Sequence, residues 1–212
     1  ITPTPDGWSL DFWVANSEKV LSPSQINKIN QSFNSKSGTL ITNYETEHLK
    51  VSSECFFKEL SPSNFLFNKV SLENKSEKNI TFSFFFAIRP YNPEGLSPIN
   101  EIVYHSENSF IINNQLSVIL DQKPDNVVCL SLEDGDISEK FNKWEMILNS
   151  KCPHQLASGF AEYRTSLQPN EKTSFSCKLV PKNTSKIKKL FQTILPKKQQ
   201  EVLKKEIKTH QI

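Results

Sequence analysis

The sequence predicts a mainly β protein: a large antiparallel sandwich of two sheets, or supersandwich, with two short helices and a helical linker at the C-terminus. Three observations favour this fold. Many short segments alternate apolar and polar residues with the period of two that strands require, and they are rich in β-branched and aromatic residues. Apolar residues make up 36% of the 212, including 15 Phe, which is ample for a packed core. Twelve Pro and only five Gly indicate many rigid connections.

Eleven segments have the strand pattern. This number is large for one open sheet and, with short turns between the segments, favours two packed sheets. Asn113-Asn114 lies between apolar arms and predicts a tight hairpin turn, because Asn tolerates positive φ. Pro169 and Asn170 predict another turn. The expected strands are Trp8–Val14, Thr39–Tyr44, Leu49–Phe57, Phe65–Glu73, Asn79–Arg89, Ile99–Tyr104, Phe110–Ile112, Leu116–Leu120, Asn126–Leu130, Gly159–Leu167 and Thr173–Val180.

Helical spacing occurs in three places. The first helix is expected to begin at Ser22-Pro23, since Ser is a good cap and Pro suits the first helical turn. The second is expected to follow a turn at residues 132–136. Both would cover edges or faces of the sheets. Their apolar faces would be Ile26, Ile29 and Phe33 in the first helix, and Ile137, Phe141, Trp144 and Leu148 in the second.

The third helical pattern begins at Ser185 and sets the domain boundary. We expect a β-sandwich domain at residues 1–181 and a basic amphipathic helical linker at residues 182–212. The linker's apolar stripe needs a surface to pack on, which the sandwich itself, a partner chain or a following domain could supply. The stripe consists of Ile187, Leu190, Phe191, Ile194 and Leu195.

The charge distribution argues against a nucleic-acid partner. Residues 182–212 contain nine Lys against Glu201 and Glu206, a net +7, which leaves −5 for residues 1–181 of a chain whose total is +2. A basic helix face is usually a solvated one, so the lysines alone do not indicate a DNA- or RNA-binding protein. No apolar run reaches the ~18–20 residues of a membrane span. We expect a soluble protein, with the cytoplasm slightly favoured over secretion.

Motifs for cofactors and covalent catalysis are missing from the sequence. The cysteines have no CxxC or paired Cys/His spacing, and the strand-like runs around three of them favour free, buried thiols over disulfides. The four His are scattered, and no glycine-rich phosphate loop or GxSxG sequence can be written. We therefore expect no metal and no cofactor. The cysteines are Cys55, Cys129, Cys152 and Cys177.

Glycoside hydrolysis needs two carboxyl groups about 5–10 Å apart. Glu94 with Glu101, or Glu133 with Asp134 and Asp136, could supply such a pair. Each of these residues lies in a turn-rich segment, where acidic residues commonly cap turns or face solvent. We favour that structural interpretation and expect no catalytic residue in this chain.

The loop RPYNPEG, which follows the most strand-like run, holds the candidate functional residues Arg89, Tyr91, Asn92 and Glu94. Its prolines stiffen the exit from a strand, and its glycine permits a sharp turn, so these side chains would be presented at one end of the sandwich. They would contact a ligand or another domain. In an equally weighted alternative, Arg89 pairs with Glu94 or Glu101 and only fixes the loop.

Three segments of the chain resemble a known family over roughly residues 8–181. These are the succession W-x-L-x-x-W at Trp8 to Trp13, then SLENKSEKNITFSFFFAIRPYNPEGLSPINEIVY, then SGFAEYRTSLQPNEKTSFSCKLVP. Together they look like the N-terminal β-supersandwich domain of glucoamylase-like and glycogen-debranching-like glycosidases. Asn74, Arg89–Pro93 and Leu167–Glu171 stand at the places of that group's turn motifs.

The resemblance implies a function without catalysis in this chain. In such enzymes a linker helix and a barrel of six helical hairpins follow the sandwich, and the barrel carries the catalytic carboxylates. The chain would then be an accessory domain or fragment of a carbohydrate-active enzyme. Its partners would be a helical catalytic domain, in the same or a separate chain, and an oligosaccharide. The alternative is a free-standing glycan-binding or surface interaction module.

Overall fold

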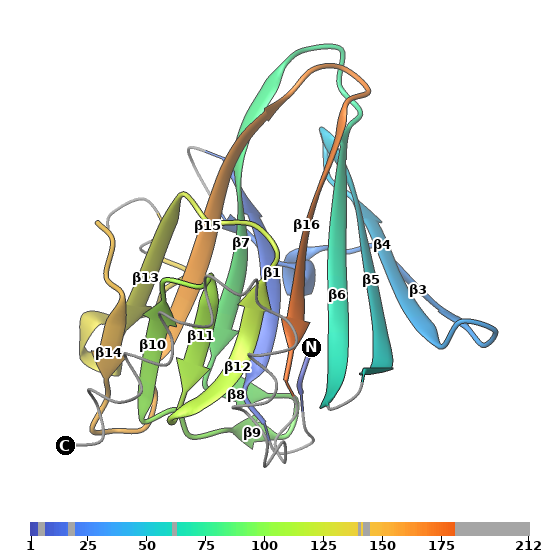
Figure 1. Cartoon of the computed structure of the whole chain (residues 1–212). Helices are drawn as coiled ribbons and strands as arrows, with labels where there is room; N and C mark the ends of the chain where they lie inside the picture. Colours follow the sequence, from blue (N-terminus) through green and yellow to red (C-terminus); the bar gives the residue numbers. More distant parts are fainter. Residues whose placement is uncertain (4–6, 17–19, 61–62, 140, 142–144, 181–212) are drawn as a thin grey trace.

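The computed structural model describes residues 1–3, 7–16, 20–60, 63–139, 141 and 145–180, and these form an antiparallel β-sandwich (Figure 1). A five-stranded sheet and a nine-stranded sheet pack face to face, and a two-stranded ribbon lies at one end. The predicted fold class is therefore confirmed. Within the described residues, no helix has the length and apolar character needed to cross a membrane.

The five-stranded sheet begins with β13 and ends with β2. Its order is β13 (Asn126–Leu130), β15 (Ser158–Leu167), β7 (Ile80–Arg89), β1 (Ser9–Ala15) and β2 (Val20–Leu21). The nine-stranded sheet has the order β14 (Asn149–Lys151), β10 (Glu101–His105), β11 (Ser109–Ile112), β12 (Gln115–Leu120), β16 (Lys172–Leu179), β6 (Ser63–Asn74), β5 (Leu49–Leu60), β4 (Thr39–Glu45) and β3 (Ile29–Asn34).

All eleven predicted strands are present, most of them within two residues of the expected ends. The sequence did not predict the edge strands β2, β3 and β14, nor the ribbon of β8 (Tyr91–Asn92) and β9 (Gly95–Leu96). The turn predictions are confirmed as well. Asn113, Asn114 and Asn170 have φ values of 51°, 60° and 63°, the left-handed conformation that Asn tolerates.

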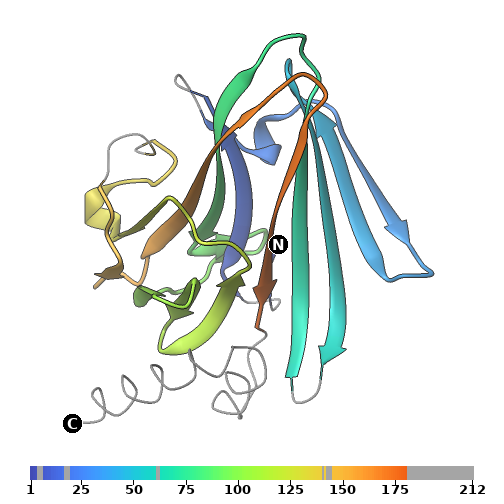
Figure 2. The ribbon, with the colours of Figure 1, turned by 45° about the horizontal axis from the view of Figure 1, so that its top comes forward.

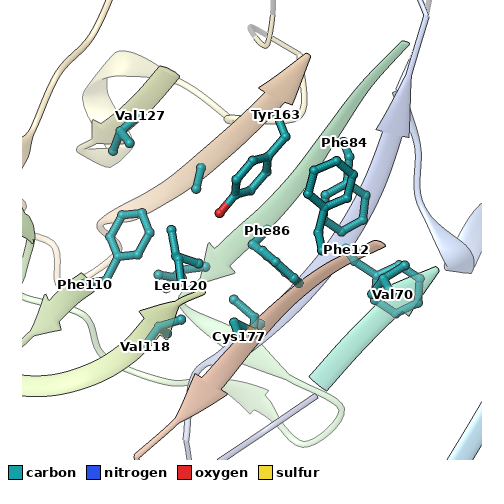
Figure 3. Close-up of a cluster of buried hydrophobic side chains, with 14 of the residues drawn as sticks. Phe12, Val70, Phe84, Phe86, Phe110, Val118, Leu120, Val127, Tyr163 and Cys177 are labelled. Carbon is teal, nitrogen blue, oxygen red and sulfur yellow. The ribbon is translucent and has the colours of Figure 1, made fainter. Parts of the chain in front are cut away.

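The run Phe84-Phe85-Phe86 is apolar throughout because the five-stranded sheet is covered on both faces. Phe84 and Phe86 point into the core between the sheets (Figure 3), where Phe84 stacks on Phe175 of β16 at 4.7 Å. Phe85 points to the other face and packs edge-on against Phe160 and Phe141. A strand buried on both faces needs no polar alternation, so it reads as a continuous apolar run.

Two connections between the sheets, β6–β7 and β15–β16, lie side by side at the end of the sandwich opposite the ribbon (Figure 1), and Asn74 joins them. Asn74 is fully buried. Its Nδ2 donates to the carbonyl oxygens of Lys78 and Leu167 at 2.8 and 3.0 Å, and its Oδ1 accepts from the backbone N–H and the hydroxyl of Ser76. One side chain thus ties the β6–β7 turn to the end of β15.

The predicted helix around residues 22–33 is wrong. Ser22 and Pro23 do stand at the start of a helical turn, but it is a single 3₁₀ turn, Pro23–Gln25. Ile29 and Phe33 belong instead to β3, which pairs with β4 along its whole length. A spacing of four residues fits one face of a helix and one face of a strand, so these positions could not decide between them.

The second predicted helix is also not observed in the described residues. A 3₁₀ turn, Leu132–Asp134, follows β13, and residues 137–139 form a turn; residues 140 and 142–144 lie outside the description. Ile137 and Phe141 nevertheless pack on the outer face of the five-stranded sheet, as expected of a covering segment. Ile147 then forms an isolated parallel β-bridge with Val128. The expected linker at residues 182–212 lies outside the described residues.

Candidate functional site

Arg89 is placed by the register of β1 and β7. Arg89 pairs with Ser9 across the two strands, so Asp11 is its diagonal neighbour on the outward face of the five-stranded sheet. The guanidinium Nη1 lies 3.2 Å from Asp11 Oδ2, and both side chains are less than one-third exposed. Water therefore screens this ion pair less than it screens an ion pair at the surface.

The Arg89 side chain also contacts two aromatic rings. Its guanidinium carbon lies 3.9 Å from the centre of the Tyr91 ring and 5.7 Å from that of Trp13, which are cation–π distances. Burial raises the pKa of Tyr91; the Arg89 charge opposes this shift, and Asp136 and Asp11 add to it. Tyr91 consequently stays neutral at physiological pH.

The rest of the loop is held by its own polar groups. Asn92 Nδ2 donates to the carbonyl oxygen of Gly7 at 2.6 Å, and Asn92 Oδ1 accepts from the backbone N–H of Glu94 at 2.8 Å. Gly95 has a φ of 135°, a backbone conformation that residues with a side chain rarely adopt. This conformation lets the chain turn back so that β9 pairs with β8. Asn92 is therefore an anchor of the loop, and the exposed Glu94 side chain is left to face solvent.

A pocket of about 260 Å³ lies beside this loop. Arg89, Pro90 and Tyr91 form one part of its wall, and the turn after β13 forms another. Two leucines of the lining are well exposed: Leu96 at 74% and Leu132 at 49%. The full lining comprises Arg89, Pro90, Tyr91, Leu96, Leu132, Gly135, Asp136, Ile137, Leu156 and Ser158.

The acidic turn after β13 is built mainly by its own capping contacts. Asp134 Oδ2 accepts from the backbone N–H of Ser131 at 2.9 Å, and Asp136 Oδ1 accepts from that of Ser138 at 2.7 Å. Glu133 Oε1 lies 3.5 Å from His154 Nε2. Asp134 and Asp136 thus cap the turn and Glu133 is exposed, as the structural interpretation expects, and only Asp136 of the three lines the pocket.

The structure brings Arg89 and Tyr91 together at the pocket, whereas Asn92 and Glu94 do not line it. The expected pairing of Arg89 with Glu94 or Glu101 is wrong, because Arg89 pairs with Asp11 and Glu101 pairs with Lys151 at 3.4 Å. Sequence reasoning missed Asp11. The signal was present: Asp11 is the one charged residue in the otherwise alternating strand WSLDFWV.

The protein is thus a two-sheet antiparallel β-sandwich with a stiff polar loop and a pocket beside that loop. No family model and no curated protein sequence matches the chain. Among solved structures, a protein described as a kojibiose phosphorylase from the human microbiome is similar over 80% of this chain, with 12% identity and a TM-score of 0.47.

A second similar structure is a polysaccharide lyase, with 11% identity over 82% of this chain and a TM-score of 0.41. The chain covers 21% of the phosphorylase and 25% of the lyase. It thus spans about a fifth to a quarter of the length of the solved structures it matches.

Proposed function

We propose that the sandwich is a non-catalytic domain of a carbohydrate-active enzyme. It supports a helical catalytic domain, in the same or a separate chain, and shapes that domain's sugar site through Arg89, Tyr91, Asn92 and Glu94. The observation that carries the proposal is the Arg89–Tyr91 stack, which stands fixed in the wall of a small pocket rimmed by exposed leucines.

The size of the pocket favours part of a site over a complete one. Complete small-molecule sites occupy ~300–1,000 Å³, whereas this pocket has about 260 Å³. A second surface placed over the loop would deepen it. Asp11 and Tyr91 already restrain the Arg89 side chain, so a sugar hydroxyl or a carboxylate of the partner could be bound with little further loss of side-chain entropy.

The exposed leucines favour a protein surface as the cover. Leu96 and Leu132 are apolar and adjoin the polar group of Arg89 and Asp136, and interfaces commonly combine an apolar centre with a polar rim. The pocket also offers one carboxylate, Asp136, whereas glycoside hydrolysis needs two. We therefore place the catalytic pair in the partner domain.

The isolated chain should release no glucose from maltose, trehalose or glycogen above a buffer blank. The matched variant Asp136→Asn should give the same null result, because Asp136 is not assigned a catalytic role. Turnover that survives repurification and disappears in Asp136→Asn would overturn the proposal.

The free-standing glycan-binding module is the second candidate, favoured by the half-buried Tyr91 ring at the pocket. A titration of the isolated chain with malto-oligosaccharides, followed by NMR, separates the two functions. Saturable submillimolar binding that is lost in Tyr91→Ala would favour the module. The accessory-domain proposal expects millimolar or weaker binding by the sandwich alone, because the partner surface completes the site.

A further inference from the structure

One edge of the nine-stranded sheet presents an inner face on which β3, β4 and β5 have one charged position, Glu59 at the end of β5. Phe33 of β3 pairs with Leu40 of β4, and Leu40 pairs with Cys55 of β5, so the three side chains share one face of the sheet. This is the inner face, because it also carries Val51 of the core between the sheets. Four charged residues occupy the alternate positions along β4 and β5, so their side chains lie on the outer face. They are Glu45, Lys50, Glu54 and Lys58.

Large apolar side chains on this face are left uncovered. Figures 1 and 2 show that β3, β4 and β5 project beyond the five-stranded sheet, which packs over the rest of the nine-stranded sheet. Four side chains on this face are exposed: Ile29 at 38%, Phe33 at 64%, Leu40 at 38% and Phe57 at 54%. We call these four residues the β3–β5 face. A polar row, Gln31, Thr42 and Ser53, separates Ile29 from the other three residues. Exposed apolar side chains gathered on one face, as on the other side of this row, mark an interaction site.

The chain itself leads toward this face. Leu179 at the end of β16 pairs with Leu66 of β6, and Leu66 pairs with Phe57 of β5, so the three residues lie in one row across the sheet. Two strand spacings, or ~10 Å, separate Leu179 from Phe57. Residues 181–186 can extend over ~20 Å, so the segment that follows reaches the β3–β5 face without strain.

The chemistry of that segment is complementary. Residues 187–195 carry an apolar stripe at helical spacing, with Lys188 and Lys189 off its centre. As a helix the stripe would rise ~12 Å, which matches the ~13 Å from Ile29 to Phe33 along β3. The net +7 of residues 182–212 is also attracted by the −5 of residues 1–181.

We propose that residues 187–195 fold as an amphipathic helix whose stripe docks on the β3–β5 face of the same chain. Docking covers the edge of the nine-stranded sheet where the five-stranded sheet leaves it open. Docking would also fix the direction in which the chain continues after residue 195. The contact lies away from the Arg89–Leu96 loop and does not depend on the function proposed for that loop.

The Cys55 thiol can report on this contact, because Cys55 pairs with Leu40 and shares the inner face with it. Cys55 is half-buried, whereas the other three cysteines, Cys129, Cys152 and Cys177, are buried. The rate at which Cys55 reacts with a thiol reagent is measured in the full chain and in Leu190→Glu/Ile194→Glu, at one fixed pH. We expect the double variant to react roughly tenfold faster, since reactivity follows the undocked population. Gln192→Glu/Thr193→Glu, with the same change of charge off the stripe, should react like the unmodified chain.

The partner surface is tested by Phe33→Glu, which should raise the Cys55 rate by a similar factor. The control is Ser32→Glu, at the preceding, outer-face position of β3. Circular dichroism confirms that each variant is folded. Equal Cys55 rates in the full chain and in Leu190→Glu/Ile194→Glu would overturn the proposal. So would protection that increases with protein concentration, because it would assign the β3–β5 face to a second copy, and so would protection that appears only on adding an oligosaccharide.

Discussion

Replacing Phe84 by alanine is expected to lower the free energy of unfolding by about 3–5 kcal/mol. Phe84 is fully buried on the inner face of β7 and contacts both sheets: it stacks on Phe175 at 4.7 Å and lies edge-on to Phe86 at 4.9 Å. Closely packed sheets cannot collapse into the space that a lost ring leaves, so a cavity term adds to the lost burial.

Phe56→Ala is the matched control for Phe84→Ala. Phe56 also stacks on a phenylalanine, Phe67 at 5.1 Å, but it is half-buried on the outer face of the nine-stranded sheet. Urea denaturation of both variants should give a loss of at most about 1.5 kcal/mol for Phe56→Ala. If the two losses were equal, the interface between the sheets would not be the main source of stability.

Replacing Asn74 by alanine is expected to cost about 2–4 kcal/mol, because it removes several hydrogen bonds at once and leaves buried groups without partners. The carbonyl oxygen of Leu167 would lose its donor inside the protein, and the β6–β7 turn would lose the acceptor that Ser76 uses. The β6–β7 and β15–β16 connections would then lose the buried side-chain link between them, while the Lys172–Glu73 ion pair and backbone hydrogen bonds would remain.

Asn34→Ala separates the effect of burial from that of the turn. Asn34 Oδ1 accepts from the backbone N–H groups of Lys36 and Ser37 in a similar turn, but the residue is exposed. Water replaces such bonds, so Asn34→Ala should cost less than about 1 kcal/mol in thermal or urea unfolding. A cost for Asn74→Ala no greater than that of Asn34→Ala would contradict the role given to Asn74.

The strands were predictable because their signals are local. The run Ile80–Arg89 is rich in aromatic residues and is followed directly by turn residues, and Asn113-Asn114 places turn residues between two apolar arms. The two helices were mispredicted where the spacing was ambiguous or where distant contacts decided the outcome. Ile29 and Phe33 are four residues apart, and only pairing with β4, which a local pattern does not reveal, makes their segment a strand.

The candidate site was predictable in part. Pro90, Pro93 and Gly95 do indicate a stiff loop after a strand, and the structure places Arg89 and Tyr91 together at a pocket. The partner of Arg89 could not be chosen from local sequence, because Asp11 is nearly eighty residues away and becomes its neighbour only through the register of β1 with β7. The pocket itself depends on the turn after β13, which reaches the loop through the order of strands in the sheet.

We propose that the loop at Arg89 is a binding surface and does more than support the fold. Arg89→Ala should cost about 1–3 kcal/mol, because it leaves Asp11 half-buried without its partner. Tyr91→Ala removes a half-buried ring at the rim of the pocket and should cost no more than about 1 kcal/mol.

The most direct measurement is amide hydrogen exchange of residues 89–96 in the sandwich alone and in a polypeptide that also carries the helical catalytic domain, with and without Tyr91→Ala. The proposal predicts that the helical domain slows exchange in this loop, and that Tyr91→Ala removes the slowing while thermal melts change little. Equal exchange in the two polypeptides, together with a large loss of stability in Tyr91→Ala, would show that the loop serves only the fold and would contradict the claim.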